Sequence, residues 1–343
     1  MPAAIDRGTL VATALRSDKN LVLRSTLDGR VFEAPLDALP ERAQGAWFDY
    51  PLGVARHLLP AGGACGVELH FGGDLPVGAG LSSSASICIA TALALDAAWG
   101  LSLEPVGWVQ AALAAERGFV GVRCGIMDPF AVGFGKAGAV LWLECKDETH
   151  THVPFDSERL VIAVADSGVR RELARGEFNL RVEQCGRAFD ALRPLAPEAQ
   201  CLADVPAAAL ERGSATLDPV LARRARHVVE EVARARAART ALERGDPTAF
   251  GAAMTACHTS LRDLFEVSTP ELDFLVQTAI EVDGVLGTRL VGAGFGGSTV
   301  ILIEAGAEAD LERHLARSAF GQGGGAPLAF FRPDAGPREL SHD

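Results

Sequence analysis

The sequence has few features of a membrane protein or of a nucleic-acid-binding protein. It contains no run of about 18 apolar residues, which is the length that a bilayer-spanning helix needs. Its N-terminus does not resemble a signal peptide, because Asp6 and Arg7 interrupt the short apolar stretch. The formal net charge of −12 argues against a broad nucleic-acid surface. We therefore expect neither a membrane nor a nucleic acid among its partners.

Cysteine is present, but it is not arranged for disulfide bonds or for zinc. The seven cysteines are odd in number and no C-x-x-C pair occurs, which predicts neither a disulfide framework nor a zinc site. Most of them lie among apolar residues, where a free thiol behaves as a small hydrophobic group. This usage indicates a reducing, cytoplasmic location.

The length and composition predict two well-packed domains. A chain of 343 residues with 48% hydrophobic and 22% charged residues has enough apolar material for extended cores, and disorder is not expected. Two strand-like apolar runs, 140–143 and 160–165, lie on either side of Pro154. We place the boundary there, which predicts domains over residues 1–154 and 155–343.

The stretch LPVGAGLSSSASICIA, residues 75–90, organises the chain. A strand-like run, 66–71, precedes it, and an alanine-rich helical run, 87–99, follows it. Between these runs lie two glycines, one leucine and three consecutive serines: Gly78, Gly80, Leu81, Ser82, Ser83 and Ser84. Glycine lets a backbone approach a ligand closely, and serines at a helix start leave N–H groups pointing outward.

This arrangement predicts an anion site at the positive end of a helix, with a nucleotide phosphate as its natural ligand. An ordinary Gly/Ser turn that caps a helix is the alternative. Neither Gly-Lys-Ser/Thr nor G-x-G-x-x-G occurs here, so neither a Walker loop nor a dinucleotide fold is indicated.

A lone carboxylate, Asp128, lies among apolar residues and glycine in the segment CGIMDPF, residues 124–130. A carboxylate is costly to bury without partners, which makes Asp128 a candidate site residue. The alternative is that Asp128 starts a helix, because proline follows it. The residues alone leave both interpretations open.

The segment PVGAGLSSSAS resembles the phosphate loop of the GHMP kinases, and that of the galactokinases most closely. Three further segments match the family in order: CGIMD, HTSLRDLFEVSTPELD and GAGFGGSTV. The resemblance implies an α/β plus α+β fold of two domains: an N-terminal mixed-sheet domain that carries the phosphate loop and a C-terminal ferredoxin-like domain. It also implies transfer of a phosphoryl group from ATP to the anomeric hydroxyl of galactose.

The resemblance further implies roles for individual residues in binding ATP. The backbone from Gly78 to Ser84 would hold the phosphates, with Ser84 and Glu116 as ligands of Mg²⁺. Trp47, in a W-x-x-Y-x-x-G-V pattern, would lie beside the adenine. For Tyr50 in the same pattern we favour a position in the core.

On the sugar side, the resemblance makes Asp128 the residue that takes the proton from the hydroxyl. Gly125 and Arg170 would lie by the substrate, as would Phe178. Phe178 stands where galactokinases usually have a tyrosine, and phenylalanine cannot make the hydrogen bond of a tyrosine hydroxyl. The identity of the sugar is therefore open, with N-acetylgalactosamine and arabinose as alternatives.

One family motif, of the form R-V-N-L-I-G-E-H-T-D-Y, does not occur in these residues. In the family it holds the groups that grip the sugar. We expect from this a misassigned gene start or a truncated chain, with weak or no activity as given. A non-catalytic galactose and ATP sensor is a further alternative, although Ser82–Ser84 and Asp128 argue against it. The oligomeric state is not predicted.

Two polar segments favour structural roles over functional ones. The helical segment 218–243 carries six arginines interspersed with glutamates, a pattern typical of a solvated face. His258 has no second histidine or cysteine at metal spacing, so we expect a hydrogen-bonded packing histidine. Four glycines within residues 292–297 indicate a tight turn that passes close to another backbone or to a ligand.

Overall fold

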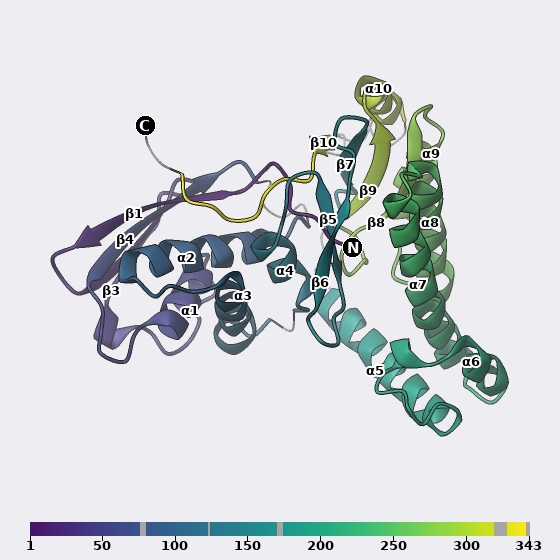
Figure 1. The fold of residues 1–343 in the computed structure, drawn as a ribbon, viewed down its shortest axis with the longest axis horizontal. Coiled ribbons are helices and arrows are strands. Elements are labelled where there is room, and N and C mark those ends of the chain that lie inside the picture. The colour runs from purple at the N-terminus through teal and green to yellow at the C-terminus, as the bar shows by residue number, and fades with distance from the viewer. Residues whose placement is uncertain (76–79, 123, 170–173, 319–327, 341–343) are drawn as a thin grey trace. The chain divides into compact units, whose positions relative to one another are not determined.

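The computed structural model describes residues 1–75, 80–122, 124–169, 174–318 and 328–340, and its helices and strands are labelled in Figure 1. The chain divides into two compact units. The first comprises Met1–Phe155 with the tail that begins at Pro333, and the second is Asp156–Arg332. Among the described residues, none of the helices has the length and apolar character needed to cross a bilayer.

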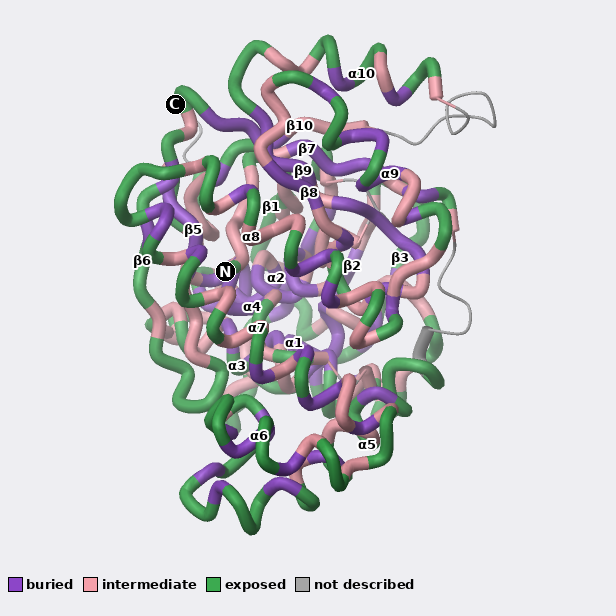
Figure 2. The backbone as a smooth tube through the Cα atoms, turned by 90° about the vertical axis from the view of Figure 1, so that its right-hand side faces the viewer, coloured by how far each residue is buried: buried purple, intermediate pink, exposed green. Residues whose placement is uncertain are grey.

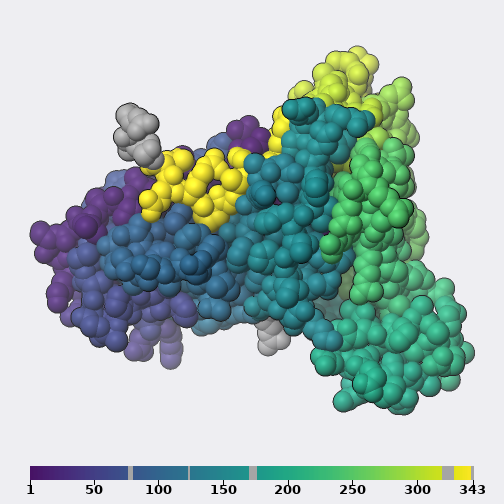
Figure 3. Space-filling model, viewed as in Figure 1, coloured from purple at the N-terminus to yellow at the C-terminus, as the bar shows by residue number. Residues whose placement is uncertain are grey.

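The tail differs from our sequence-based division, which assigned it to the C-terminal domain. Pro333 forms a β-bridge with Ile5, and the Asp334 N–H donates to the Ala4 carbonyl at 3.1 Å. Figure 3 shows the tail, in yellow, lying on blue residues of the first unit. The tail belongs to the first unit because its backbone hydrogen bonds are made there.

The sheet of the first unit is mixed, as the resemblance implied. Its four strands are β1 (Thr9–Arg16), β2 (Asn20–Ser25), β3 (Val31–Pro35) and β4 (Gly66–Gly73), in the order β1-β4-β2-β3. Strand β4 runs parallel to β2 and antiparallel to β1, and β2 pairs with β3 in antiparallel fashion. A separate hairpin pairs β5 (Ala139–Leu143) with β6 (His150–Pro154).

Helix α2 (Ser83–Trp99) lies at the centre of the first unit and packs against α1, α3, α4 and β1. The described residues of this unit also form α1 (Asp49–Leu58), α3 (Pro105–Leu113), a π-helix (Ala114–Val120), α4 (Met127–Gly133) and a 3₁₀ turn (Leu36–Ala38). Apolar residues occur on all sides of α2, a pattern typical of a buried helix, and Figure 2 shows most of it as buried. Because these elements pack around α2, the serines at its N-terminus are held in a fixed position by the core of the first unit.

The second unit has the ferredoxin-like topology that the resemblance implied. Strands β7 (Leu160–Asp166), β8 (Val285–Leu290), β9 (Ser298–Glu304) and β10 (Leu328–Phe331) form an antiparallel sheet in the order β10-β7-β9-β8. Helices between β7 and β8 and a helix between β9 and β10 complete the β-α-β-β-α-β pattern. They are α5 (Ala174–Leu192), α6 (Ala207–Ser214), α7 (Pro219–Glu243), α8 (Pro247–Ser260), α9 (Pro270–Ile280) and α10 (Glu308–Arg317).

The glycine-rich turn between β8 and β9 passes close to other backbone, which was one of the two predicted explanations. A Cβ on Gly294 would lie 2.2 Å from the Val267 carbonyl oxygen, and one on Gly296 would lie 2.6 Å from that of Val169. Both glycines also have positive φ. Only glycine satisfies both conditions without displacing the neighbouring backbone.

The solvated face predicted for residues 218–243 is wrong for Arg224. This side chain is 2% exposed, and it donates hydrogen bonds to the Gln184 amide oxygen, the Leu264 carbonyl and the Glu266 carboxylate at 2.9, 2.5 and 2.6 Å. A guanidinium can be buried when its N–H groups are satisfied in this way. Arg224 therefore joins α5 and α7 to the π-helix Leu261–Phe265 and the residue after it.

The packing role predicted for His258 is confirmed. The buried ring accepts a hydrogen bond at Nδ1 from the Leu290 N–H, at 3.3 Å. Its proton must then lie on Nε2, which donates to Asp273 Oδ1 at 3.0 Å. Both nitrogens are used in holding α8 to β8 and α9.

A second buried histidine, His227, predicts a loss of stability in acid. Its Nδ1 lies 2.8 Å from the Ser260 hydroxyl, and burial lowers its pKa from 6.5 to about 4. The unfolded chain therefore binds more protons than the folded chain between these values, so stability falls as the pH drops from 6.5 towards 4. The difference corresponds to a loss of roughly 3 kcal/mol.

Urea unfolding at pH 7, 5.5 and 4.5 measures this effect. The charged groups that face the ring are Glu231, Arg234, Arg224 and Arg289, and they remain in place in His227→Gln. We expect the variant to lose much less stability than the wild type over this range. Equal losses in the two proteins would show that other groups cause the acid sensitivity.

Candidate active site

The N-terminus of α2 has an unusual backbone. Gly80 and Ser82 both have positive φ, at 75° and 55°. Ser82 is the N-cap residue, but its side chain makes no capping hydrogen bond with the first turn of α2. The Ser82 hydroxyl thus leaves the N–H groups of this turn to other acceptors, and such groups favour anions. Gly78 lies outside the described residues.

Asp128 lies beside Ser82, although 46 residues separate the two in the sequence. The Ser82 hydroxyl donates to Asp128 Oδ2 at 2.5 Å. Asp128 is in the first turn of α4, whose N-cap is Ile126. Its carboxylate therefore faces the start of α2 and does not cap α4, which favours the first of the two interpretations left open by the sequence.

Glu116 is a buried carboxylate in the same region, 3% exposed and located in the π-helix Ala114–Val120. Burial raises the pKa of Glu116, and the negative charge of Asp128 raises it further. The Ser84 side chain lowers this pKa and so opposes part of the shift. The Cys124 thiol donates to Glu116 Oε2 at 3.6 Å. A π-turn often marks a functional position in a helix.

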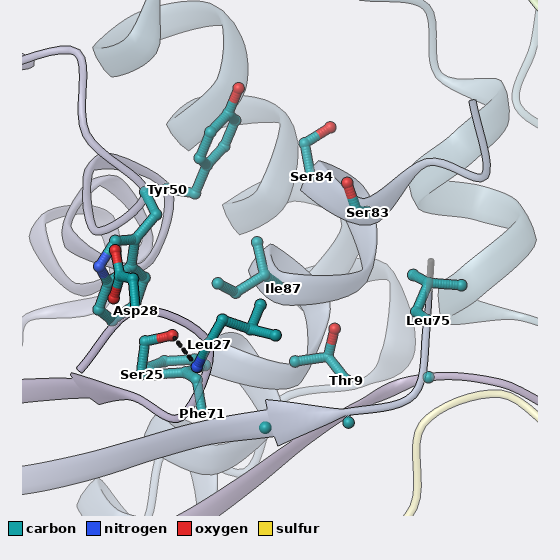
Figure 4. A pocket seen from close by; sticks show the side chains of 14 residues that line it. Thr9, Ser25, Leu27, Asp28, Tyr50, Phe71, Leu75, Ser83, Ser84 and Ile87 are labelled. Carbon is teal, nitrogen blue, oxygen red and sulfur yellow. Dashed lines mark hydrogen bonds between the residues drawn. The ribbon is translucent and has the colours of Figure 1, made fainter. Parts of the chain in front are cut away.

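A pocket of about 280 Å³ opens beside the first turn of α2 (Figure 4). Figure 4 shows the hydroxyls of Ser83 and Ser84 at one side, with Ile87 and Leu27 near the centre of the view. The lining residues are Gly8, Thr9, Ser25, Leu27, Asp28, Trp47, Tyr50, Phe71, Gly72, Gly73, Leu75, Ser83, Ser84 and Ile87. Apolar walls with a few polar groups among them are typical of a small-molecule site.

Trp47, which the resemblance placed beside the adenine, lines this pocket. Its ring packs edge-on against Phe71, with centroids 5.5 Å apart. Its indole Nε1 is buried and has no hydrogen-bond partner within the described part of the chain. A buried donor without an acceptor is costly, so this nitrogen fits a site where a ligand supplies the acceptor.

The remaining predicted site residues lie in different surroundings and do not all belong to the first unit. Leu81 is half-buried next to Ser82, and Gly125 is exposed, with open space around its Cα. Phe178 belongs to α5 of the second unit and is 38% exposed. Arg170 lies outside the described residues.

Several pocket residues were not predicted from the sequence. Thr9 comes from β1, and Ser25 and Asp28 come from the end of β2 and the turn after it. Tyr50, which we expected in the core, is half-buried, packs against the core and also lines the pocket. The signal in the sequence was its spacing from Trp47, because Trp47 lies just before α1 and Tyr50 lies in its first turn.

Comparison with known proteins agrees with this arrangement. Family models described as the GHMP kinases N terminal domain and the GHMP kinases C terminal match residues 49–136 and 238–321. A galactokinase of Roseiflexus sp. (strain RS-1) is 40% identical over 306 residues, which cover 88% of this chain and 77% of that protein. The galactokinase of Homo sapiens is 36% identical over 322 residues, covering 92% and 81%.

Among solved structures, Lactococcus lactis galactokinase in complex with galactose is similar, with a TM-score of 0.91 and 30% identity. The match covers 98% of this chain and 88% of that one. A mevalonate kinase, at 19% identity and a TM-score of 0.64, shares the fold. The sequence matches and the two-unit topology together show that this chain belongs to the galactokinase family of the GHMP kinases.

Proposed function

We propose that this protein transfers the γ-phosphoryl group of ATP to the anomeric hydroxyl of galactose. The observation that carries the proposal is the grouping of two carboxylates, Asp128 and Glu116, with two serine hydroxyls at the N-terminus of α2. The choice of sugar is supported by the relatives, which are galactokinases, and by the galactose bound to the Lactococcus lactis enzyme.

The chain's own residues supply positioning and proton transfer, which carry most of the catalysis in phosphoryl transfer. The N–H groups at the start of α2 bind phosphate oxygens. Asp128 orients the anomeric hydroxyl and accepts its proton. As that O–H bond breaks, the hydroxyl oxygen forms a bond to the γ-phosphorus, and the bond from the γ-phosphorus to the bridging oxygen breaks to release ADP.

Ser84 and Glu116 fit a Mg²⁺ ion that arrives with the nucleotide. Mg²⁺ prefers oxygen ligands, and proteins usually provide one or two carboxylates while phosphates and waters complete the shell. Ser84 and Glu116 offer a hydroxyl and a carboxylate, and the two lie close enough for the serine side chain to lower the pKa of the carboxyl. No group of three or more metal-binding side chains is found among the described residues. When bound, Mg²⁺ would neutralise charge on the phosphates.

Release of ADP by the purified chain with MgATP, with and without D-galactose, tests the function. We expect galactose-dependent release and galactose 1-phosphate as the product, identified by ³¹P NMR. ATP binding without sugar-dependent release would contradict the proposal and favour a sensor. The rate addresses a separate expectation: turnover of about 1–100 s⁻¹ would show that the predicted weak activity is wrong.

A panel of sugars tests the alternative substrates. Phe178 offers no hydroxyl on α5, which is the observation that keeps N-acetylgalactosamine and arabinose as candidates. Higher kcat/KM with either of these than with galactose would replace galactose as the substrate.

We also propose a cytoplasmic location, which the seven free thiols support.

The unpartnered indole nitrogen predicts that Trp47 contributes to nucleotide affinity. Replacing Trp47 by phenylalanine keeps an aromatic ring and removes the donor, so we expect weaker ATP binding by about 5- to 10-fold, the effect of one hydrogen bond of roughly 1 kcal/mol. Calorimetric titration with ATP measures this. Trp99→Phe is the control, because the Trp99 Nε1 donates to the Cys65 carbonyl. Unchanged affinity in Trp47→Phe would contradict the prediction.

A further inference from the structure

Ser82 has two features that a role in phosphate binding does not explain. Its backbone is left-handed, with φ 55° and ψ 43°, a conformation disfavoured for residues other than glycine. Its hydroxyl proton is directed at Asp128 Oδ2, 2.5 Å away. Strained residues persist where the surrounding structure holds them, and they are frequent at functional positions.

The two features are connected through the start of α2. A serine at an N-cap usually has extended backbone, and its hydroxyl oxygen accepts a hydrogen bond from an N–H of the first turn. Ser82 has neither property. Its side chain is turned away from those N–H groups and toward the carboxylate. The N–H groups remain available for an anion while the hydroxyl is used elsewhere.

We infer that Ser82 is a positioning residue for Asp128, an inference that rests on the proposed function and deepens it. Asp128 is partly exposed in the first turn of a short helix, so its side chain has other rotamers available. A short hydrogen bond to a charged acceptor is a strong one and selects a single rotamer. Ser82 thereby holds the proton acceptor at the end of α2 where the phosphates are proposed to bind.

Loss of the hydroxyl should therefore reduce kcat and leave nucleotide affinity unchanged. We expect kcat to fall roughly 10- to 100-fold in Ser82→Ala, the effect of a misplaced catalytic group. Ser82→Gly also lacks the hydroxyl but relieves the backbone strain. The same fall in both variants would assign the effect to the hydroxyl, whereas normal kcat in Ser82→Gly would assign it to the backbone and overturn the inference.

The chain provides a matched control in Ser102. It is an exposed serine with φ 57° that lies between α2 and α3. Ser102→Ala makes the same substitution at a residue with nearly the same φ and should retain wild-type kcat. Calorimetric titration with MgATP should give the same dissociation constant for Ser82→Ala and the wild type. Weaker MgATP binding by Ser82→Ala would show that the Ser82 hydroxyl contacts the phosphates, and this would overturn the inference.

A double-variant cycle tests the pair without relying on activity. Ser82→Ala, Asp128→Ala and the double variant are compared by urea midpoint. If the hydrogen bond links the two residues, the double variant is less destabilised than the two single effects combined. Additive effects would overturn the inference. Absence of galactose-dependent ADP release in the wild type would instead contradict the proposed function, and the urea midpoints would still decide whether Ser82 holds Asp128.

Discussion

Asp128→Asn should lose roughly 10²–10⁴-fold in kcat if the carboxylate accepts the proton of the sugar hydroxyl. The amide that replaces it has the same shape and can still accept the hydrogen bond of the Ser82 hydroxyl, so the side chain keeps its place. An amide cannot take up a proton at neutral pH. The expected loss therefore measures proton acceptance separately from orientation, and single-turnover kinetics with galactose provide the measurement.

Asp128→Asn should also bind MgATP as the wild type does, because the phosphates are proposed to bind the N-terminus of α2. Asp190→Asn, on the exposed surface of α5, is the matched control and should keep its activity. Near-normal turnover by Asp128→Asn would exclude Asp128 as the base. The catalytic effect would then come from positioning alone.

Arg224→Met should destabilise the protein by roughly 3 kcal/mol. The substitution leaves the Gln184 oxygen, the Leu264 carbonyl and one Glu266 oxygen without this donor. Breaking a buried pair costs about 3–5 kcal/mol. We expect the lower end because the Glu266 side chain is 42% exposed and water can compensate part of its loss. Urea unfolding followed by circular dichroism measures the change.

Arg223→Met is the matched control for this prediction. Arg223 precedes Arg224 on the same helix and donates to the other oxygen of the same carboxylate at 2.8 Å. Its side chain is 38% exposed, compared with 2% for Arg224. An exposed ion pair contributes about 0–1 kcal/mol. Similar losses in the two variants would show that burial of Arg224 does not determine its contribution.

Local patterns in the sequence were sufficient to predict most elements of the fold. The strand-like runs 66–71 and 160–165 lie within β4 and β7, and the helical run 87–99 lies within α2. The sequence did not predict where an α-helix continues as a π-helix. Helix α3 continues as a π-helix at Ala114, a change that we did not predict. A π-turn has the same apolar pattern over so few residues, so periodicity does not reveal it.

The candidate site was predicted only in part, because local sequence patterns do not show which separate elements meet at a pocket. The serines at the start of α2 and the lone carboxylate Asp128 were chosen from residue type and local context. Thr9, Asp28 and Tyr50 were not chosen as pocket residues, because each has an ordinary local setting in a strand, a turn and a helix. Their role in the pocket arises where β1, the turn after β2 and α1 meet the first turn of α2.

The sequence by itself was sufficient to predict the buried helix α2, a start of this helix suited to an anion, and the two-domain organisation. These follow from hydrophobic patterning and from glycine and serine chemistry, which act over a few neighbouring residues. Only the tertiary structure decided that the Ser82 hydroxyl meets Asp128 and that Arg224 is buried. Such contacts depend on how separate elements pack, and side chains far apart in the chain meet only when the cores that carry them have formed.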